Sequence, residues 1–258
     1  MIFLVFSLLF LLIMTILTIW VGANFASLKG AYGEKQVSKL LRSLDLNHNT
    51  LLNDLYIPKQ DGTTTQIDHV LISDKGLFVI ETKNYNGWIF GSQNSKYWTQ
   101  VIYKRKEKFY NPIWQNSGHI KELRHFLGDA FSDIPIYSLI VFGKQATLKF
   151  NKPFYGVNVI KIRDLLSVIK YISSDHTISS STRKKIHQLL SSTYIMDKKE
   201  KKAQKIEHVT IIKQNINKQN HKVISNICPQ CGGQLVSRKG KYGNFRGCNN
   251  YPNCRFTA

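Results

Sequence analysis

Three charged side chains fall close together at one end of a predicted β-hairpin. Residues 67–80 form two apolar, β-branched runs around a four-residue turn candidate, a pattern typical of two antiparallel strands. The register that this turn imposes places Asp68 opposite Glu81. Lys83 follows two residues later, on the same face of its strand. The pattern therefore predicts two facing carboxylates and one amine at the open end of the hairpin.

Facing carboxylates on paired strands repel each other by a few tenths to about 1 kcal/mol. A divalent cation such as Mg²⁺ or Mn²⁺ would offset this repulsion, because it binds oxygen ligands from one or two carboxylates and leaves room for water and a phosphate oxygen. Lys83 would then reach the attacking water or the scissile phosphate, which is the chemistry of phosphodiester hydrolysis. The alternative is an ion cluster in which Lys83 simply neutralises Asp68 and Glu81, and the hairpin alone does not separate the two.

The cysteines form a second candidate site, because all four lie near the end of the chain at Cys228, Cys231, Cys248 and Cys254. The spacing C-x2-C, sixteen residues, C-x5-C provides the four thiolates that tetrahedral Zn²⁺ requires. A disulfide scaffold would not leave the rest of the chain without cysteine. We therefore expect a zinc finger in a reducing compartment.

Cations and aromatic rings alternate around these cysteines, with no acidic residue among them. Cations for phosphates and rings for bases are typical of a surface that binds single-stranded nucleic acid, whereas a zinc knob that only stabilises the fold does not need this charge. The candidate nucleic-acid-binding residues are Arg238, Lys239, Lys241, Tyr242, Phe245, Arg246, Tyr251 and Arg255.

The elements that must position these residues follow from apolar periodicity. Residues 30–46 are expected to form an amphipathic helix, with Glu34 on or beside its apolar stripe. A helix should begin at Pro112, after Asn111. Strands are expected at 51–57, in the hairpin, at 88–91, at 97–101 and at 136–142. This order predicts an α/β domain, followed by a helical extension and, at 196–225, a basic segment that forms either a solvated linker or a loose helix.

Several other conspicuous residues are expected to be structural. The register places His69 on the face opposite Asp68, and His119 and His125 belong to a helix, where packed or solvated positions are more common than ligands. The aromatic residues of the strand-rich region are more often core than base-stacking groups, and these are Tyr85, Trp88, Tyr97 and Trp98.

The composition points to a polyanionic partner. Lys and Arg number 36 against 16 Asp and Glu, a formal net charge of +20, which favours nucleic acid or an anionic membrane surface. Residues 2–23 contain no ionisable side chain and are long enough to cross a bilayer of about 30 Å as a helix. A cleaved signal peptide fits less well, because the charged n-region is missing. Lys and Arg follow this segment and do not precede it, so we expect a single-pass anchor in the cell membrane, with the residues after about 28 in the cytoplasm.

Four motifs occur in order along the chain: G-x-x-G-E ending at Glu34, I-D-H-V-L around Asp68, E-T-K-N-Y with the following G-x-I, and N-P-x-x-Q ending at Gln115. Together they resemble the nuclease-related domain (NERD) family of the PD-(D/E)xK nuclease superfamily. The cysteine segment resembles the C-terminal zinc fingers of bacterial type I topoisomerases through C-P-x-C-G-G-x-L, G-x-F-x-G-C and Y-P-x-C.

The nuclease resemblance implies a restriction-endonuclease-like core of a helix, a mixed sheet with a central hairpin, a helix and a strand. It implies that Asp68 and Glu81 bind Mg²⁺ or Mn²⁺ and that Lys83 orients or activates water. It further implies that Glu34 assists placement of metal or substrate and that Gln115 supports the site. The expected organisation is an anchor at 1–24, a nuclease-related domain at 29–146, a helical extension at 147–195, a basic linker at 196–225 and a zinc finger at 226–258.

These features favour a membrane-anchored, metal-dependent nuclease that acts on DNA, including single-stranded DNA. The alternative is a membrane-tethered DNA-binding protein that does not cut, although a pure binder has no need of facing carboxylates. A protein that uses its basic segment on anionic lipid would leave the carboxylate pair and the finger's rings unexplained. The sequence has no Walker lysine loop, dinucleotide glycine fingerprint or G-x-S-x-G elbow, so no nucleotide cofactor is expected.

Overall fold

The computed structural model describes residues 14, 27–45, 47–172, 177–193, 198–240 and 243–258. The chain divides into two compact units, Met1–Tyr194 and Ile195–Ala258. Apart from Met14, the expected anchor at 1–24 lies outside the described residues. Within the described ranges, no helix combines the length and the apolarity needed to cross a membrane.

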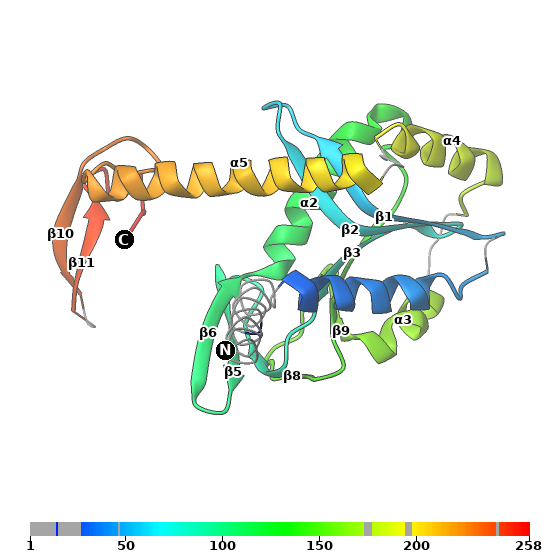
Figure 1. Ribbon diagram of the computed structural model, residues 1–258, viewed down its shortest axis with the longest axis horizontal. Coiled ribbons are helices and arrows are strands. Elements are labelled where there is room, and N and C mark those ends of the chain that lie inside the picture. The colour runs from blue at the N-terminus through cyan, green and yellow to red at the C-terminus, as the bar shows by residue number, and fades with distance from the viewer. Residues whose placement is uncertain (1–13, 15–26, 46, 173–176, 194–197, 241–242) are drawn as a thin grey trace, which may run out of the picture. The chain divides into compact units, whose positions relative to one another are not determined.

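A five-stranded mixed sheet forms the centre of the first unit (Figure 1). Its strands are β1 (Asn49–Pro58), β2 (Thr64–Ser73), β3 (Gly76–Lys83), β7 (Ile136–Phe142) and β9 (Val157–Lys161), and they lie side by side in that order. Strands β1 to β3 are antiparallel, whereas β3, β7 and β9 are parallel to one another. The mixed α/β class expected from the order of elements is therefore confirmed.

The hairpin β2–β3 has the predicted register. Its pairs run from Ser73 opposite Gly76 to His69 opposite Ile80. The regular pairing ends there, one residue before Asp68 would meet Glu81. The Asp68 carboxylate accepts a hydrogen bond from the backbone N–H of Thr82 at 2.8 Å, so Asp68 and Glu81 lie just beyond the last regular pair of the hairpin.

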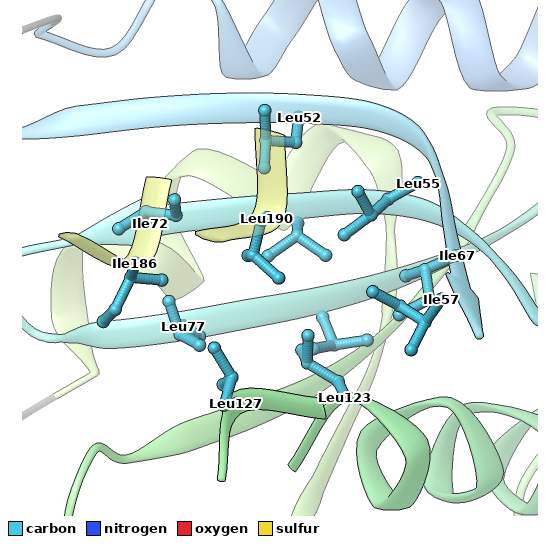
Figure 2. Packing of buried hydrophobic residues seen from close by; sticks show 12 residues of the cluster. Leu52, Leu55, Ile57, Ile67, Ile72, Leu77, Leu123, Leu127, Ile186 and Leu190 are labelled. Carbon is cyan, nitrogen blue, oxygen red and sulfur yellow. The ribbon is translucent and has the colours of Figure 1, made fainter. Parts of the chain in front are cut away.

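Helices cover both faces of the sheet, which explains why β2 and β3 are apolar on both sides. On one face, α2 (Pro112–Leu127) and α4 (Ser180–Ser191) pack Leu123, Leu127, Ile186 and Leu190 against the strands (Figure 2). On the other face lie the helix at 27–41 and α3 (Leu165–Tyr171), as Figure 1 shows. The predicted first helix and the helix starting at Pro112 are both present.

A second sheet of four strands, in the order β6-β5-β4-β8, packs beside the first. Its strands are β4 (Gly87–Phe90), β5 (Tyr97–Ile102), β6 (Arg105–Tyr110) and β8 (Ala146–Leu148). Its inner face buries Ile89 and Trp98 completely, and the Trp98 ring stacks on Phe142 of β7 at 6.2 Å. The short 3-10 turns η1 (Asp129–Phe131) and η2 (Ile162–Asp164) lie in connections.

The segment at 147–195, expected as a helical extension, also supplies β9 at the edge of the main sheet. The expectation was wrong in this respect because a five-residue edge strand is too short to stand out from the helices that follow it. In the second unit, the basic segment forms a long helix, α5 (Lys198–Ile224), so the helical alternative holds. A two-stranded ribbon of β10 (Leu235–Gly240) and β11 (Gly243–Cys248) follows.

Candidate functional site

A network of charged and polar side chains occupies the end of β3 beside α2. The Lys83 Nζ lies 2.7 Å from Glu81 Oε1 and donates a hydrogen bond of 3.0 Å to Gln115 Oε1. On its other oxygen, Glu81 lies 3.3 Å from His119 Nε2. The His119 Nδ1 is in turn 2.8 Å from the hydroxyl of Thr65 on β2. Only 3% of the Glu81 side chain and 16% of the Lys83 side chain are exposed, so this network is held in a largely dry environment.

Asp68 and Glu34 bring further carboxylates to the same region. The pKa of Asp68 is raised well above its usual range by burial and, next, by the charges of Glu81 and Glu34. Burial, with the charges of Asp54, Glu34 and Asp68, raises the pKa of Tyr56 to about 12. These effects place Glu34 near the hairpin, as its inward position on the predicted helix implied.

The helix at 27–41 is held against the end of β3 by Asn84, the residue after Lys83. The Asn84 amide donates a hydrogen bond of 2.7 Å to the carbonyl of Lys29. A Cβ on Gly33 would lie 2.5 Å from the Asn84 Cβ, so only glycine allows this approach. Because Gly33 precedes Glu34, the contact fixes the position at which Glu34 enters the site.

Helix α2 is fixed by two buried asparagines. The Asn111 side chain caps the helix by accepting a hydrogen bond from the Ile113 N–H at 2.9 Å. The Asn116 amide donates to the Val79 carbonyl at 3.0 Å and to the Ser138 hydroxyl at 2.8 Å, which ties α2 to β3 and β7. These bonds fix the position of α2 along the strands, and with it the positions of Gln115 and His119.

The ionic states of the central pair follow from their contact. Burial acts to raise the pKa of Glu81, but the ammonium of Lys83 and the neighbouring His119 outweigh it, and the pKa is lowered. Burial likewise acts to lower the pKa of Lys83, but the Glu81 carboxylate raises it above its usual range. The pair is therefore an ammonium and a carboxylate, whereas burial, with the charges of Glu81 and Glu34, favours the protonated form of Asp68.

This donor set fits a divalent cation. Carboxylate oxygens are the ligands that Mg²⁺ and Mn²⁺ prefer. Burial raises the pKa of Asp68 most, and the charges of Glu81 and Glu34 raise it further; a cation beside Asp68 and Glu81 would offset that repulsion and favour the ionised carboxylate. The structure thus brings the five predicted residues into one region. Glu81, Lys83 and Gln115 are in direct contact. Asp68 is close enough to Glu81, and Glu34 close enough to Asp68 and Tyr56, to raise a pKa electrostatically.

Three residues near this site were not predicted as contributors from the sequence: His119, Thr65 and Asp54. His119 was expected to be packed or solvated, and it is buried, but it also contacts Glu81. Its spacing of four residues from Gln115 was the available signal, because such residues share one helix face. Asp54 has a φ of 52° in the middle of β1, an irregularity that no sequence pattern predicts.

His69 is buried against Asn53, with 2.7 Å between His69 Nδ1 and Asn53 Oδ1, in keeping with a structural role.

The four cysteines of the second unit form a metal centre. Their Sγ atoms all lie within 4.8 Å of one another, with 3.7 Å between Cys228 and Cys254 and 3.3 Å between Cys231 and Cys248. Tetrahedral zinc with Zn–S bonds of about 2.3 Å separates its sulfurs by about 3.8 Å. The backbone N–H of Asn250 points to Cys248 Sγ at 3.4 Å. The donor set therefore fits Zn²⁺.

The candidate nucleic-acid-binding residues of the finger divide between two faces of its ribbon. Arg238 pairs with Phe245 across the strands, and its guanidinium lies over the Tyr251 ring at 5.7 Å. These three, together with Arg255, line a hollow of about 280 Å³. Arg246 points to the other face and donates to the Val223 carbonyl at 2.8 Å. Lys239 lies exposed on that other face, and Lys241 and Tyr242 lie outside the described residues.

Comparison with known proteins decides the family. Residues 29–143 match the family model described as the nuclease-related domain. The chain is also 34% identical over 213 residues to an uncharacterized protein of Bacillus anthracis, covering 82% of this chain and 99% of that protein. The chain belongs to the nuclease-related domain family. The matched range contains all five candidate site residues of the first unit, from Glu34 to Gln115.

Beyond the nuclease-related domain, residues 225–258 match the model of the topoisomerase DNA-binding C4 zinc finger. This part is 58% identical over 31 residues to DNA topoisomerase 1 of Methanocaldococcus jannaschii and 47% identical over 45 residues to that of Helicobacter pylori. These matches span only 4% and 6% of the topoisomerases, so they concern the finger alone. No solved structure matches the chain.

Proposed function

We propose that this protein is a divalent-metal-dependent nuclease that hydrolyses phosphodiester bonds of DNA, with the zinc finger holding the nucleic acid. The observation that carries the proposal is the Lys83 amine, which lies between Glu81 and Gln115 with a second carboxylate, Asp68, at the same strand end. The match to the nuclease-related domain and the DNA-binding finger support it.

Each side chain has a role that its contacts allow. Asp68 and Glu81 would hold Mg²⁺ or Mn²⁺, which lowers the pKa of a bound water and neutralises charge on the phosphate. The Lys83 amine would orient or activate the attacking water, and Gln115 would keep the amine in place through its 3.0 Å hydrogen bond. Glu34 would assist the placement of metal or substrate from the first helix.

We also propose that residues 1–24 anchor the protein in the cell membrane, with the rest of the chain in the cytoplasm. The support is the apolar run without ionisable side chains and the lysines that follow it. Carbonate extraction of cell membranes tests this, and a full chain that leaves the membrane fraction on extraction would contradict it.

The nuclease is tested by incubating the full chain with single- and double-stranded DNA, with Mg²⁺ or Mn²⁺ added or omitted. Asp68→Asn should abolish cleavage, because it removes a negative ligand while keeping the size of the side chain and an oxygen for the Thr82 N–H. Lys83→Met should lower the rate by about 10²- to 10⁴-fold. Asp133→Asn and Lys121→Met, at exposed positions, are matched controls and should retain full activity.

Circular dichroism of each variant shows whether loss of activity reflects loss of fold. Binding of DNA without cleavage in either metal, unchanged by Asp68→Asn and Lys83→Met, would instead indicate a tethered DNA-binding protein. In that case Glu81 and Lys83 form a structural ion pair.

A further inference from the structure

The second sheet has one face that its fold does not explain. Along each strand, alternate side chains point inward, where Ile89 and Trp98 are fully buried. The other face carries large aromatic rings in contact with solvent. Trp88 is 53% exposed, Tyr97 is 51% exposed and Tyr110 is 45% exposed. We call this outer surface, with the adjoining Phe90 and Trp114, the aromatic face.

The rings of the aromatic face are neighbours without being stacked on one another. Trp88 and Phe90 meet at 6.3 Å with their planes 77° apart, and Tyr97 and Tyr110 meet at 6.4 Å with planes 80° apart. Tyr110 continues to Trp114 at 6.3 Å and 76°. An edge-to-face pair covers one side of one ring, whereas a parallel stack covers a side of both rings, so the observed pairs leave more ring surface open to a flat ligand.

Lysines accompany the rings on the same face. Across the strands, Trp88 aligns with Val101 and then Lys106, and Phe90 aligns with Thr99 and then Lys108. The Lys149 Nζ lies 5.7 Å from the centre of the Trp88 ring, and the Lys96 Nζ lies 5.4 Å from that of Tyr97.

Acidic side chains do not share the outward positions of the described strands with these lysines. At the outward positions of the four described strands of this sheet there is no acidic residue. Glu107 alternates to the opposite side, where it pairs with Arg105. A row of rings beside a row of ammonium groups matches bases beside their phosphates. A hollow of about 650 Å³, lined in part by Phe90, Lys149, Lys152 and Tyr155, continues the basic surface.

We infer that the aromatic face binds a single strand of nucleic acid, stacking its unpaired bases on the rings. Bases within a duplex are already stacked, so their faces are not available to this surface. The face ends at Trp114, and the next residue, Gln115, holds Lys83. A strand bound here would therefore lead to the candidate nuclease site. The inference rests on the proposed nucleic-acid ligand but not on its cleavage.

Crosslinking of the full, zinc-loaded chain to oligothymidine that carries 5-iodouracil tests this inference directly. No Mg²⁺ or Mn²⁺ is added, so the result does not depend on whether the protein cuts. We expect crosslinks at Trp88, Tyr97, Tyr110 or Trp114, located by mass spectrometry of the peptides. Crosslinks confined to the zinc finger would overturn the inference.

Charge reversal provides a second measurement. The double variant Lys106→Glu with Lys108→Glu should weaken binding of fluorescent single-stranded DNA by about tenfold or more and reduce its salt dependence. Lys184→Glu with Lys185→Glu, exposed on α4, makes the same change of charge away from the second sheet and should alter affinity less than about twofold. Equal affinities for the two double variants would contradict the inference. If the β6 variant lost binding to phosphatidylglycerol vesicles while keeping that to DNA, the face would be a membrane surface instead.

Discussion

At the scale of single residues, the centre of the candidate site is the Glu81 carboxylate, which has a partner on each oxygen. Glu81 has Lys83 on one oxygen and His119 on the other. Glu81 and Lys83 are predictable from the sequence because strand alternation fixes which face each occupies. His119 is not predictable as a partner, since its contact depends on the position of α2 along β3, which the buried Asn116 determines.

The geometry predicts that His119 is a positioning residue for Glu81. His119→Ala removes the group at 3.3 Å from Glu81 Oε2, and the carboxylate is then free to turn away from the proposed metal ion. Changes of this kind to the partners of metal ligands cost about 10- to 100-fold in metal affinity or activity. We expect a loss of nuclease rate of that size, with a higher Mg²⁺ concentration needed for half-maximal rate.

His125→Ala is the matched control on the same helix, because His125 is exposed and contacts Gln60 instead of the site. A His119→Ala variant with the wild-type rate and the wild-type Mg²⁺ dependence would show that His119 only fills space.

At the scale of elements, periodicity and turn signals predicted most of the first unit. The strand at 136–142, the helix beginning after Asn111 and the hairpin register all agree with the structure. Strand β6 was not predicted, because its sequence RKEKFY is charged and almost fully exposed. Its position comes from pairing with β5, a tertiary contact that a local pattern does not contain.

The packing of the first helix gives a prediction at this scale. Gly33→Ala would place a Cβ 2.5 Å from Asn84 Cβ, so the helix must shift away from the end of β3. Overpacking of this kind destabilises by about 1–3 kcal/mol. We expect a lower midpoint in urea unfolding and reduced nuclease activity, since Glu34 moves with the helix.

Gly30→Ala tests the same helix without the clash, because nothing lies within 4 Å of a Cβ added at Gly30. Alanine is a better helix former than glycine by about 1 kcal/mol, so this variant should be as stable as the wild type or slightly more stable. Equal behaviour of the two variants would mean that the approach of the helix to Asn84 is not a constraint.

At the scale of the whole molecule, the chain joins a nuclease-related domain to a zinc finger that resembles those of topoisomerases. The cysteine spacing predicted the metal centre well, because four ligands within a short segment leave few other arrangements. The aromatic face was only partly visible in the sequence. Trp88 and Tyr97 are exposed whereas Trp98 and much of Tyr85 are buried, and strand alternation separates them only once the sheet's inner face is known.

Asp68 and Glu81 are proposed to form a metal site and not merely an ion cluster at a strand end. Electron paramagnetic resonance of Mn²⁺ titrated into the full, zinc-loaded chain tests it most directly, with Asp68→Asn alongside. We predict that the wild type binds Mn²⁺ at a site that Asp68→Asn lacks, and that added Mg²⁺ displaces it. Identical Mn²⁺ titrations for the two proteins would contradict a metal site at Asp68 and leave Glu81, Lys83 and His119 as a structural cluster.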